Sequence, residues 1–154
     1  MTETLVILGS TGSIGVQALD VCRRLGINVC GLSVHSNIDL LERQIDEFHP
    51  SAVCVMNEKR AFELRNRVGG ACAVVSGMDG LLETASMPEA DTVLNALVGI
   101  IGLRPALASI EAGKNIVLAN KETLVSAGEF VMRRALERRV KIYPVDSEHS
   151  AIFQ

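Results

Sequence analysis

Two patterns of hydrophobic and polar residues alternate along this chain. Short apolar runs rich in Val, Ile, Leu and Cys are typical of buried strands, and stretches with apolar residues every three or four positions are typical of amphipathic helices. The runs predict strands over residues 5–8, 28–34, 51–56, 71–76, 92–95, 115–118 and 140–145. The stretches predict helices over residues 14–25, 38–48, 58–68, 78–85, 105–112 and 121–138.

The boundaries between these elements carry residues that start or stop helices. Gly26 and Gly113 each follow a predicted helix, and Pro50 follows another. Asn37 and Asn120 stand at the N-cap position of the next helices. Strand and helix therefore alternate without a repeat or a low-complexity segment, as in parallel sheets joined by helical crossovers. We expect an α/β fold, with a Rossmann-like, doubly wound, mostly parallel seven-stranded sheet and helices on both faces.

Composition is consistent with this fold and limits the partners. Of the 154 residues, 48% are hydrophobic but only 3% are aromatic, so the core must be aliphatic, as between strands buried on both faces. The net charge of −3 without a basic block argues against nucleic acid or an anionic membrane as a partner. The first residues lack the features of a signal peptide, and the apolar run Val93–Leu103 is too short to span a bilayer. We expect a soluble, cytoplasmic protein.

The cysteines occur one at a time within apolar patterns, and no C-x-x-C pair is present. Single cysteines in such patterns are typical of buried thiols in a reducing compartment. We expect free thiols, rather than disulfides or metal ligands, at all four positions: Cys22, Cys30, Cys54 and Cys72.

A glycine-rich turn connects the first predicted strand to the first predicted helix. Its glycines, Gly9, Gly12 and Gly15, have the spacing Gly-x-x-Gly-x-x-Gly instead of the usual G-x-G-x-x-G. A strand, a glycine turn and a helix N-terminus in this order form a phosphate-binding geometry, because backbone N–H groups and the positive end of the helix dipole point at the turn. Taken alone, the turn fits a nucleotide site and an ordinary tight turn equally well.

The end of the second predicted strand distinguishes between the two nicotinamide dinucleotides. A site for NAD places Asp or Glu there to hold the ribose 2′-OH, but this chain has Ser33-Val34-His35-Ser36-Asn37. A carboxylate would repel a 2′-phosphate, whereas the side chains of His35, Ser36 and Asn37 can donate hydrogen bonds to one. The loop therefore favours NADP, although a simple capped turn explains the same residues.

Two later loops follow the fifth and sixth predicted strands. The loop Asn95–Gly102 is small and apolar, which suits a platform under a nicotinamide ring and equally a buried aliphatic turn. The loop Asn120-Lys121-Glu122 opens a helix. Glu122 is ordinary in a first helical turn, but Lys121 is unfavourable with the helix dipole, which suggests that it is kept there for a ligand.

The last predicted strand leads into two carboxylates, Asp146 and Glu148. Residues i and i+2 of an extended segment share a face, so both carboxylates point the same way. Oxygen ligands of this kind suit Mg²⁺ or Mn²⁺ and do not suit zinc or copper. By spacing alone, a solvated acidic turn and a partial metal site explain these residues equally well.

Three motifs taken together resemble the 1-deoxy-D-xylulose-5-phosphate reductoisomerase family. The motifs are Gly9-Ser-Thr-Gly-Ser-Ile-Gly15, Leu118-Ala-Asn-Lys-Glu122 and Pro144-Val-Asp-Ser-Glu-His149, the last followed by Ala151-Ile-Phe-Gln154. The resemblance covers the whole chain in order. It implies an NADPH-binding domain over residues 1–145 and, over 146–154, the start of a catalytic domain. The remainder of that domain and a C-terminal helical domain would lie beyond these residues.

The resemblance also implies roles for individual residues. By this resemblance, the pyrophosphate is contacted by Thr11, Gly12, Ser13 and Ile14. The adenosine ribose and its 2′-phosphate are contacted by His35, Ser36 and Asn37, and other parts of NADPH by Asn120 and Glu122. By the same resemblance, the substrate is contacted by Lys121, Ser147 and Glu148, and the metal is bound by Asp146 and Glu148. Lys121 and Glu148 would have catalytic roles. Many relatives carry Gly-Lys-Asn or Gly-Arg-Asn at residues 35–37, so His35-Ser36 departs from the family pattern and lacks its basic residue.

The activity that the resemblance implies is NADPH-dependent isomerisation and reduction of 1-deoxy-D-xylulose 5-phosphate to 2-C-methyl-D-erythritol 4-phosphate, in isoprenoid synthesis, by an enzyme that is a homodimer when intact. We expect these 154 residues alone to bind cofactor without turnover, because a third metal ligand is missing. Two alternatives remain open. Another NADP-dependent Rossmann dehydrogenase would need a catalytic Cys or base after the fifth or sixth strand, and a non-catalytic NADP-binding sensor would not use the two carboxylates beside Lys121.

Overall fold

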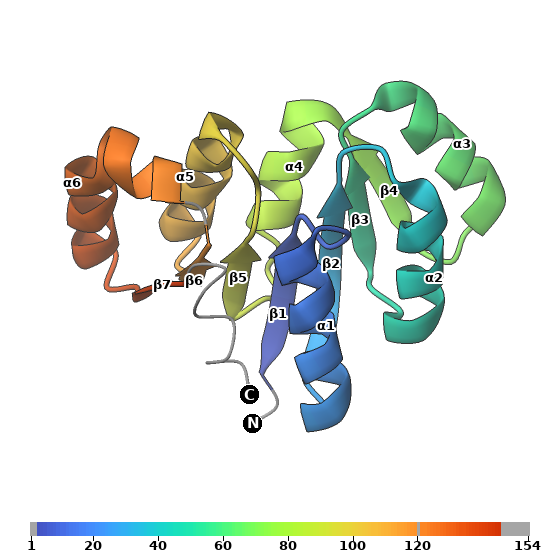
Figure 1. The fold of residues 1–154 in the computed structure, drawn as a ribbon, viewed down its shortest axis with the longest axis horizontal. Helices are drawn as coiled ribbons and strands as arrows, with labels where there is room; N and C mark the ends of the chain where they lie inside the picture. The colour runs from blue at the N-terminus through green and yellow to red at the C-terminus, as the bar shows by residue number, and fades with distance from the viewer. Residues whose placement is uncertain (1–2, 120, 146–154) are drawn as a thin grey trace.

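One parallel sheet of seven strands forms the centre of the molecule. The computed structural model describes residues 3–119 and 121–145, without the side chains of residues 121–124 and 126. The strands lie in the order β4-β3-β2-β1-β5-β6-β7, and every neighbouring pair is parallel (Figure 1). They are β1 (Thr4–Leu8), β2 (Asn28–Val34), β3 (Ala52–Val55), β4 (Ala73–Ser76), β5 (Thr92–Asn95), β6 (Asn115–Leu118) and β7 (Ile142–Pro144).

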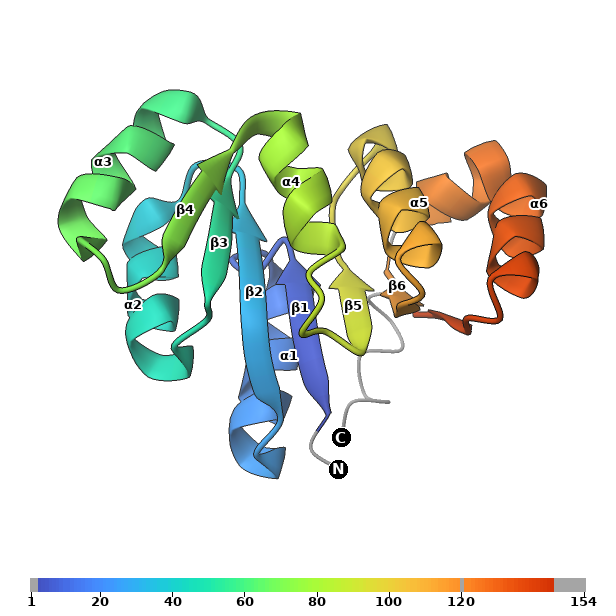
Figure 2. The same ribbon diagram turned by 180° about the vertical axis from the view of Figure 1, so that it is seen from behind.

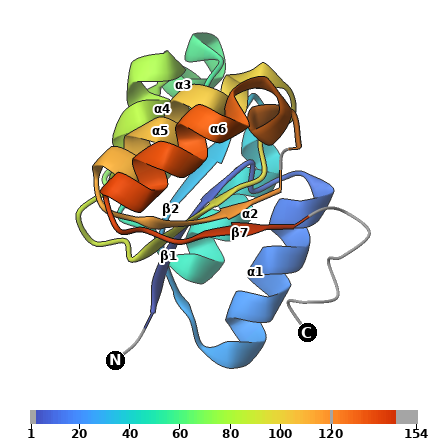
Figure 3. The ribbon, with the colours of Figure 1, turned by 90° about the vertical axis from the view of Figure 1, so that its left-hand side faces the viewer.

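Helices cover both faces of this sheet. They are α1 (Ser13–Leu25), α2 (Ile38–Phe48), α3 (Glu58–Val68), α4 (Gly77–Ala85), the 3₁₀ turn η1 (Ile100–Gly102), α5 (Leu103–Glu111) and α6 (Lys121–Glu137). The view along the sheet shows α1 on one side and α4, α5 and α6 on the other (Figure 3). Seen from behind, α4 leads the chain from the outer strands β3 and β4 back to β5, beside β1 (Figure 2).

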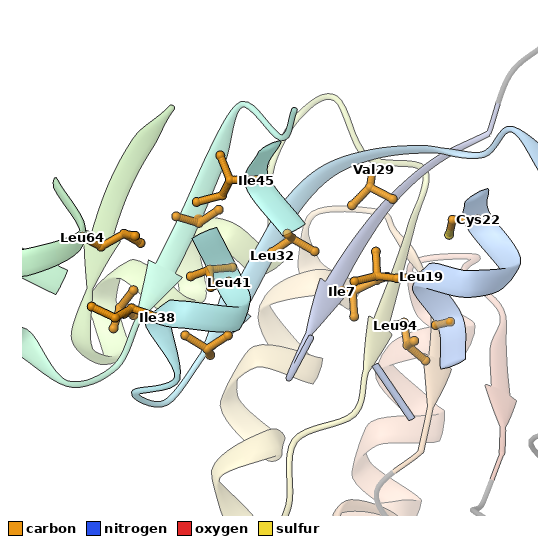
Figure 4. Close-up of a cluster of buried hydrophobic side chains, with 14 of the residues drawn as sticks. Ile7, Leu19, Cys22, Val29, Leu32, Ile38, Leu41, Ile45, Leu64 and Leu94 are labelled. Carbon is orange, nitrogen blue, oxygen red and sulfur yellow. The ribbon is translucent and has the colours of Figure 1, made fainter. Parts of the chain in front are cut away.

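Alternate residues of the strands enter the cores on opposite faces. Ile7 of β1 packs with α1, α2 and α3 in a cluster that includes Leu19, Leu41 and Leu64 (Figure 4). Its neighbours Val6 and Leu8 face the opposite cluster, under α4. Because both faces of the sheet are buried, the central strands are apolar at nearly every position. A third cluster joins β6 to α5 and α6 through Ala106, Ile110, Ile116, Leu118, Val131 and Ala135.

The fold class predicted from the sequence is confirmed, and so are the helix caps that the described residues allow us to check. Gly26 ends α1 in the left-handed conformation, with its N–H donating to the Cys22 carbonyl, and the Asn37 side chain accepts a hydrogen bond from the Leu40 N–H at the start of α2. Three of the cysteines are buried and Cys72 is half-buried, all of them as free thiols. In the described part of the chain, no helix is long and apolar enough to cross a membrane.

The structure differs from the prediction in several elements. The helix predicted over residues 121–138 is interrupted at Ala127, whose φ of −145° and ψ of 25° are not helical. Ala127 packs against the third cluster. Its neighbours in the sequence are Ser126 and Gly128, and small residues of this kind are common where helices bend. The loop after β5, predicted without regular structure, contains η1. Strands β3, β4 and β7 are also shorter than predicted.

Candidate functional site

Three loops meet at one edge of the sheet, where the strands end. They follow β1, β2 and β5 and contain residues 9–12, 35–37 and 96–99. All strands point the same way and β1 lies between β2 and β5, so the three loops are neighbours (Figure 1). Between β1 and β5 the strand order reverses direction, and in doubly wound sheets ligands bind at this switch point.

The glycines after β1 allow the chain to pack closely at this point. A Cβ added at Gly9 would lie 2.9 Å from the carbonyl oxygen of Ala96, and one added at Gly15 would lie 2.2 Å from that of Gly9. No other residue type fits either position without movement of the backbone. Gly12 is different, because it is exposed and the nearest atom to an added Cβ is 3.7 Å away. Gly9 and Gly15 therefore fix the loop, and Gly12 leaves open space on its outer side.

The N-terminus of α1 is open to an anion. Its N-cap residue, Gly12, provides no side-chain cap, and no acidic residue lies in its first turn. By contrast, Asn37 and Asn57 cap α2 and α3 through their side-chain oxygens. The first helical hydrogen bond of α1 runs from the Val16 N–H to the Gly12 carbonyl, and the N–H groups before it have no acceptor within the helix. These N–H groups and the helix dipole form an anion-binding geometry.

Residues of β2 and α2 hold the glycine loop in place. The N–H groups of Gly9 and Ser10 both donate to the Ser33 carbonyl, at 3.0 and 2.9 Å, and the Gly9 N–H also lies 3.1 Å from Ser33 Oγ. Ser10, fully buried, makes two hydrogen bonds with the Gln44 side chain: its hydroxyl donates to the amide oxygen, and its carbonyl oxygen accepts from the amide nitrogen. Neither Ser33 nor Gln44 is predicted as part of the site from the sequence. Each of them carries a signal in the sequence: Ser33 is a polar residue within an apolar strand, and Gln44 is a polar residue on the apolar face of a helix.

The loop after β2 presents His35, Ser36 and Asn37, and all three are exposed. The Asn57 N–H donates to the His35 carbonyl at 2.9 Å, so the loop is held from α3 as well as from its own helix. The acidic residue next in the chain, Asp39, accepts a hydrogen bond from Arg67 of α3 at 2.7 Å, which lowers the pKa of the Asp39 carboxyl. The Asp39 carboxylate therefore forms an ion pair with Arg67, a residue of α3.

Asn95 organises the loop after β5. Its buried side chain donates to the Gly102 carbonyl at 2.9 Å and accepts from the Leu97 N–H at 3.3 Å, so it bridges the two ends of the loop. Two large apolar side chains of this loop are exposed: Val98 at 88% and Ile100 at 58%. Exposed apolar side chains beside an anion-binding helix end suit a ligand that combines phosphates with a flat ring.

The remaining predicted site residues lie partly outside the described residues. Lys121 and Glu122 begin α6, but their side chains are not described, and Asn120, Asp146, Ser147 and Glu148 lie outside the described residues altogether. Within the described part of the chain, no group of three His, Cys, Asp or Glu side chains could hold a metal ion. Val145, buried, donates its N–H to the Leu118 carbonyl at 2.8 Å, at the end of β6.

Known proteins match this chain along its whole length. A family model described as 1-deoxy-D-xylulose 5-phosphate reductoisomerase matches residues 5–128. Proteins of that name from Ruminiclostridium cellulolyticum and Acetivibrio thermocellus are 52% and 55% identical to it over 155 aligned residues. Each alignment covers 100% of this chain and 41% of the relative, so the chain spans about two fifths of the length of the curated relatives it matches.

Solved structures of the same kind share the fold. A crystal structure of DOX-P reductoisomerase in complex with NADPH, fosmidomycin and magnesium is 40% identical, with a TM-score of 0.89 over 96% of this chain and 37% of the other. The 1-deoxy-D-xylulose 5-phosphate reductoisomerase from Zymomonas mobilis in complex with NADPH is 35% identical, with a TM-score of 0.90 over 100% of this chain and 41% of the other. The chain belongs to the 1-deoxy-D-xylulose 5-phosphate reductoisomerase family.

Proposed function

We propose that this chain is the NADPH-binding part of a 1-deoxy-D-xylulose 5-phosphate reductoisomerase. Residues 1–145 form the cofactor domain and residues 146–154 begin the catalytic domain. The observation that carries the proposal is the uncapped, acid-free N-terminus of α1 at the switch point of the sheet. The solved relatives in complex with NADPH have the same fold over almost the whole chain.

The pyrophosphate of NADPH binds at the turn between β1 and α1. Thr11, Gly12, Ser13 and Ile14 surround it, and the N–H groups of the first helical turn, which have no acceptor within the helix, are its donors. Gly12 has no side chain to compete for these donors, and its open side leaves room for the phosphates.

The adenosine ribose and its 2′-phosphate bind at the loop after β2. His35, Ser36 and the amide nitrogen of Asn37 are exposed donors, while the amide oxygen of Asn37 is used to cap α2. Asp39, the acid next to this loop in the sequence, is paired with Arg67, which also pairs with Glu42 and Glu63, so Asp39 is not a free carboxylate facing the 2′-phosphate. This arrangement supports NADP over NAD without a basic residue in the triplet itself.

The nicotinamide ring binds over the loop Asn95–Gly102, where Val98 and Ile100 supply exposed apolar surface. Asn120 and Glu122, at the start of α6, contact the same end of the cofactor, and Lys121 contacts the substrate. Asn95 accounts for the rigidity that such a platform needs, since it bridges the two ends of its own loop.

Asp146 and Glu148 are two ligands of a divalent cation, Mg²⁺ or Mn²⁺, and Ser147 binds substrate beside them. Their carboxylate oxygens fit these hard cations, and Val145 brings the chain to the end of β6 just before Asp146. When bound, the cation and NADPH supply polarisation of the substrate oxygens and a hydride, respectively. This chain positions the two groups, and Lys121 and Glu148 act at the substrate.

The complete protein, on this proposal, isomerises and reduces 1-deoxy-D-xylulose 5-phosphate to 2-C-methyl-D-erythritol 4-phosphate and acts in the cytoplasm as a homodimer. The relatives are more than twice as long as this chain, so we expect the 154 residues alone to bind NADPH without turnover. Loss of NADPH absorbance at 340 nm that depends on 1-deoxy-D-xylulose 5-phosphate, measured with the 154 residues alone, would contradict this.

Calorimetric titration of the chain with NADPH and with NADH tests the cofactor assignment. We expect NADPH to bind at least tenfold more tightly, because its 2′-phosphate adds hydrogen bonds at residues 35–37. Ser36→Asp places there the acid that NAD sites use, and we expect it to reduce or reverse the preference. Ser36→Asn, which is neutral, is the matched control and should keep it. Equal affinities of the unsubstituted chain for the two dinucleotides would show that the assignment to NADP is wrong.

A further inference from the structure

Gln44 is a polar side chain on the apolar face of α2. It follows Ile38 and Leu41 and precedes Ile45, which are all buried, and it is itself only 6% exposed. A buried amide is normally retained only where both of its polar ends are hydrogen-bonded. Both ends of Gln44 bind one residue, Ser10 of the glycine loop, 34 positions away in the sequence.

The two hydrogen bonds run in opposite directions. Gln44 Nε2 donates to the Ser10 carbonyl oxygen at 2.9 Å, and Gln44 Oε1 accepts from the Ser10 hydroxyl at 2.7 Å. The Ser10 N–H donates to the Ser33 carbonyl at 2.9 Å. Every polar group of Ser10 is thus bound by β2 or α2. The Gln amide has both a donor and an acceptor, so it can donate to the carbonyl and accept from the hydroxyl at once, whereas an ionised Glu of the same length could only accept.

The bond to the Ser10 carbonyl has a consequence for the next residue. That carbonyl and the N–H of Thr11 belong to one peptide group, which is planar and trans, so the two point in opposite directions. Because Gln44 holds the carbonyl towards α2, the Thr11 N–H points away from α2. Thr11 lies in the turn that leads into the uncapped end of α1, directly before the N-cap residue Gly12.

We propose that Gln44 is a positioning residue for the cofactor: through the peptide group between Ser10 and Thr11 it directs the Thr11 N–H at the pyrophosphate. This inference rests on the proposed binding of NADPH. One helix then serves both phosphate-binding parts of the site, since α2 carries the 2′-phosphate loop at its N-cap, Asn37, and the glycine loop through Gln44, two turns later.

Gln44→Met tests the proposal, because Met has a similar length and cannot make either hydrogen bond. A groove of about 190 Å³ between α1 and α2 borders Gln44, so the new side chain has room to adjust. Ile45→Met is the matched control: it changes the neighbouring buried residue of α2, whose apolar side chain cannot hydrogen-bond to Ser10. We expect Gln44→Met to weaken NADPH binding at least tenfold and Ile45→Met to leave it within twofold.

The ligand 2′-AMP separates a positioning role from a general disturbance of α2, because it carries the ribose phosphate but no pyrophosphate. We expect Gln44→Met to bind 2′-AMP as tightly as the unsubstituted chain does. Equal losses for NADPH and 2′-AMP would mean that Gln44 only supports the fold of α2, and no loss for either would also overturn the proposal. If the unsubstituted chain fails to bind NADPH, the failure belongs to the proposed function instead.

A measurement on the unsubstituted chain keeps the proposal testable if Gln44→Met does not fold. In ¹⁵N-labelled protein, titration with NADPH should shift the amide resonance of Thr11 strongly, and titration with 2′-AMP should leave it nearly unchanged. A Thr11 amide that does not respond to saturating NADPH would overturn the assignment.

Discussion

Gly12→Asp is expected to stabilise the fold and weaken cofactor binding at the same time. Gly12 is the N-cap of α1, with a φ of −78° that any residue can adopt and space for a side chain. Replacing Gly by Asp at an N-cap gains a few tenths of a kcal/mol, and the negative charge at the positive end of the helix dipole adds roughly 0.3–1 kcal/mol. We expect the free energy of unfolding to rise by about 0.5–1 kcal/mol.

Affinity should change in the opposite direction, because the carboxylate occupies the donors that we assign to the pyrophosphate. Two unit charges about 4 Å apart repel by about 1 kcal/mol even in water. Two phosphate charges therefore cost about 2 kcal/mol, or roughly a 30-fold weaker affinity at 1.4 kcal/mol per tenfold. Higher salt should reduce part of this loss, since Gly12 is exposed.

Urea unfolding followed by circular dichroism and calorimetric titration with NADPH measure the two effects. Gly12→Asn caps the helix without the charge, and we expect it to keep most of the gain in stability with a smaller loss of affinity. An Asp variant that binds NADPH as tightly as the unsubstituted chain, or that is less stable by more than about 1 kcal/mol, would refute the reasoning.

Two further predictions concern packing and the thiols. Gly15→Ala should lower the free energy of unfolding by about 1–3 kcal/mol, because its Cβ would lie 2.2 Å from the Gly9 carbonyl oxygen. Gly128→Ala, with no atom within 4 Å of its added Cβ, should not destabilise the chain in the same urea titration, and equal midpoints for the two variants would contradict this. Burial raises the pKa of the Cys54 thiol to about 12. The unfolded chain ionises first, so stability that is fully present below pH 9 should fall as the pH rises towards 12. Cys54→Val should reduce this decline, and a slope unchanged by that substitution would rule out Cys54 as its source.

The sequence predicts the elements well because most of their signals are local. Strands buried on both faces are nearly continuous apolar runs, and the cap at Asn37 depends on a neighbour three residues away. The strand order depends on contacts between distant residues. The glycine loop donates to Ser33 and to Gln44, which lie 24 and 34 positions from their partners Gly9 and Ser10, so no local pattern contains these hydrogen bonds. Ala127, where α6 is interrupted, packs against a cluster that α5, β6 and α6 form together, which is also a contact that no local pattern contains. The role of Asp146 and Glu148 as metal ligands stays a prediction, because both lie outside the described residues.

The order of the strands also has a consequence for how the chain folds. β1 pairs with β2, whose residues follow closely in the sequence, and with β5, where Leu5 lies opposite Thr92. Closing a long loop costs more entropy than closing a short one, and distant pairings slow folding. We therefore expect β1, α1 and β2 to associate early and to bring Ser33 to the glycine loop. The pairing of β1 with β5 should form late. Folding would then complete the phosphate side of the site before its nicotinamide side.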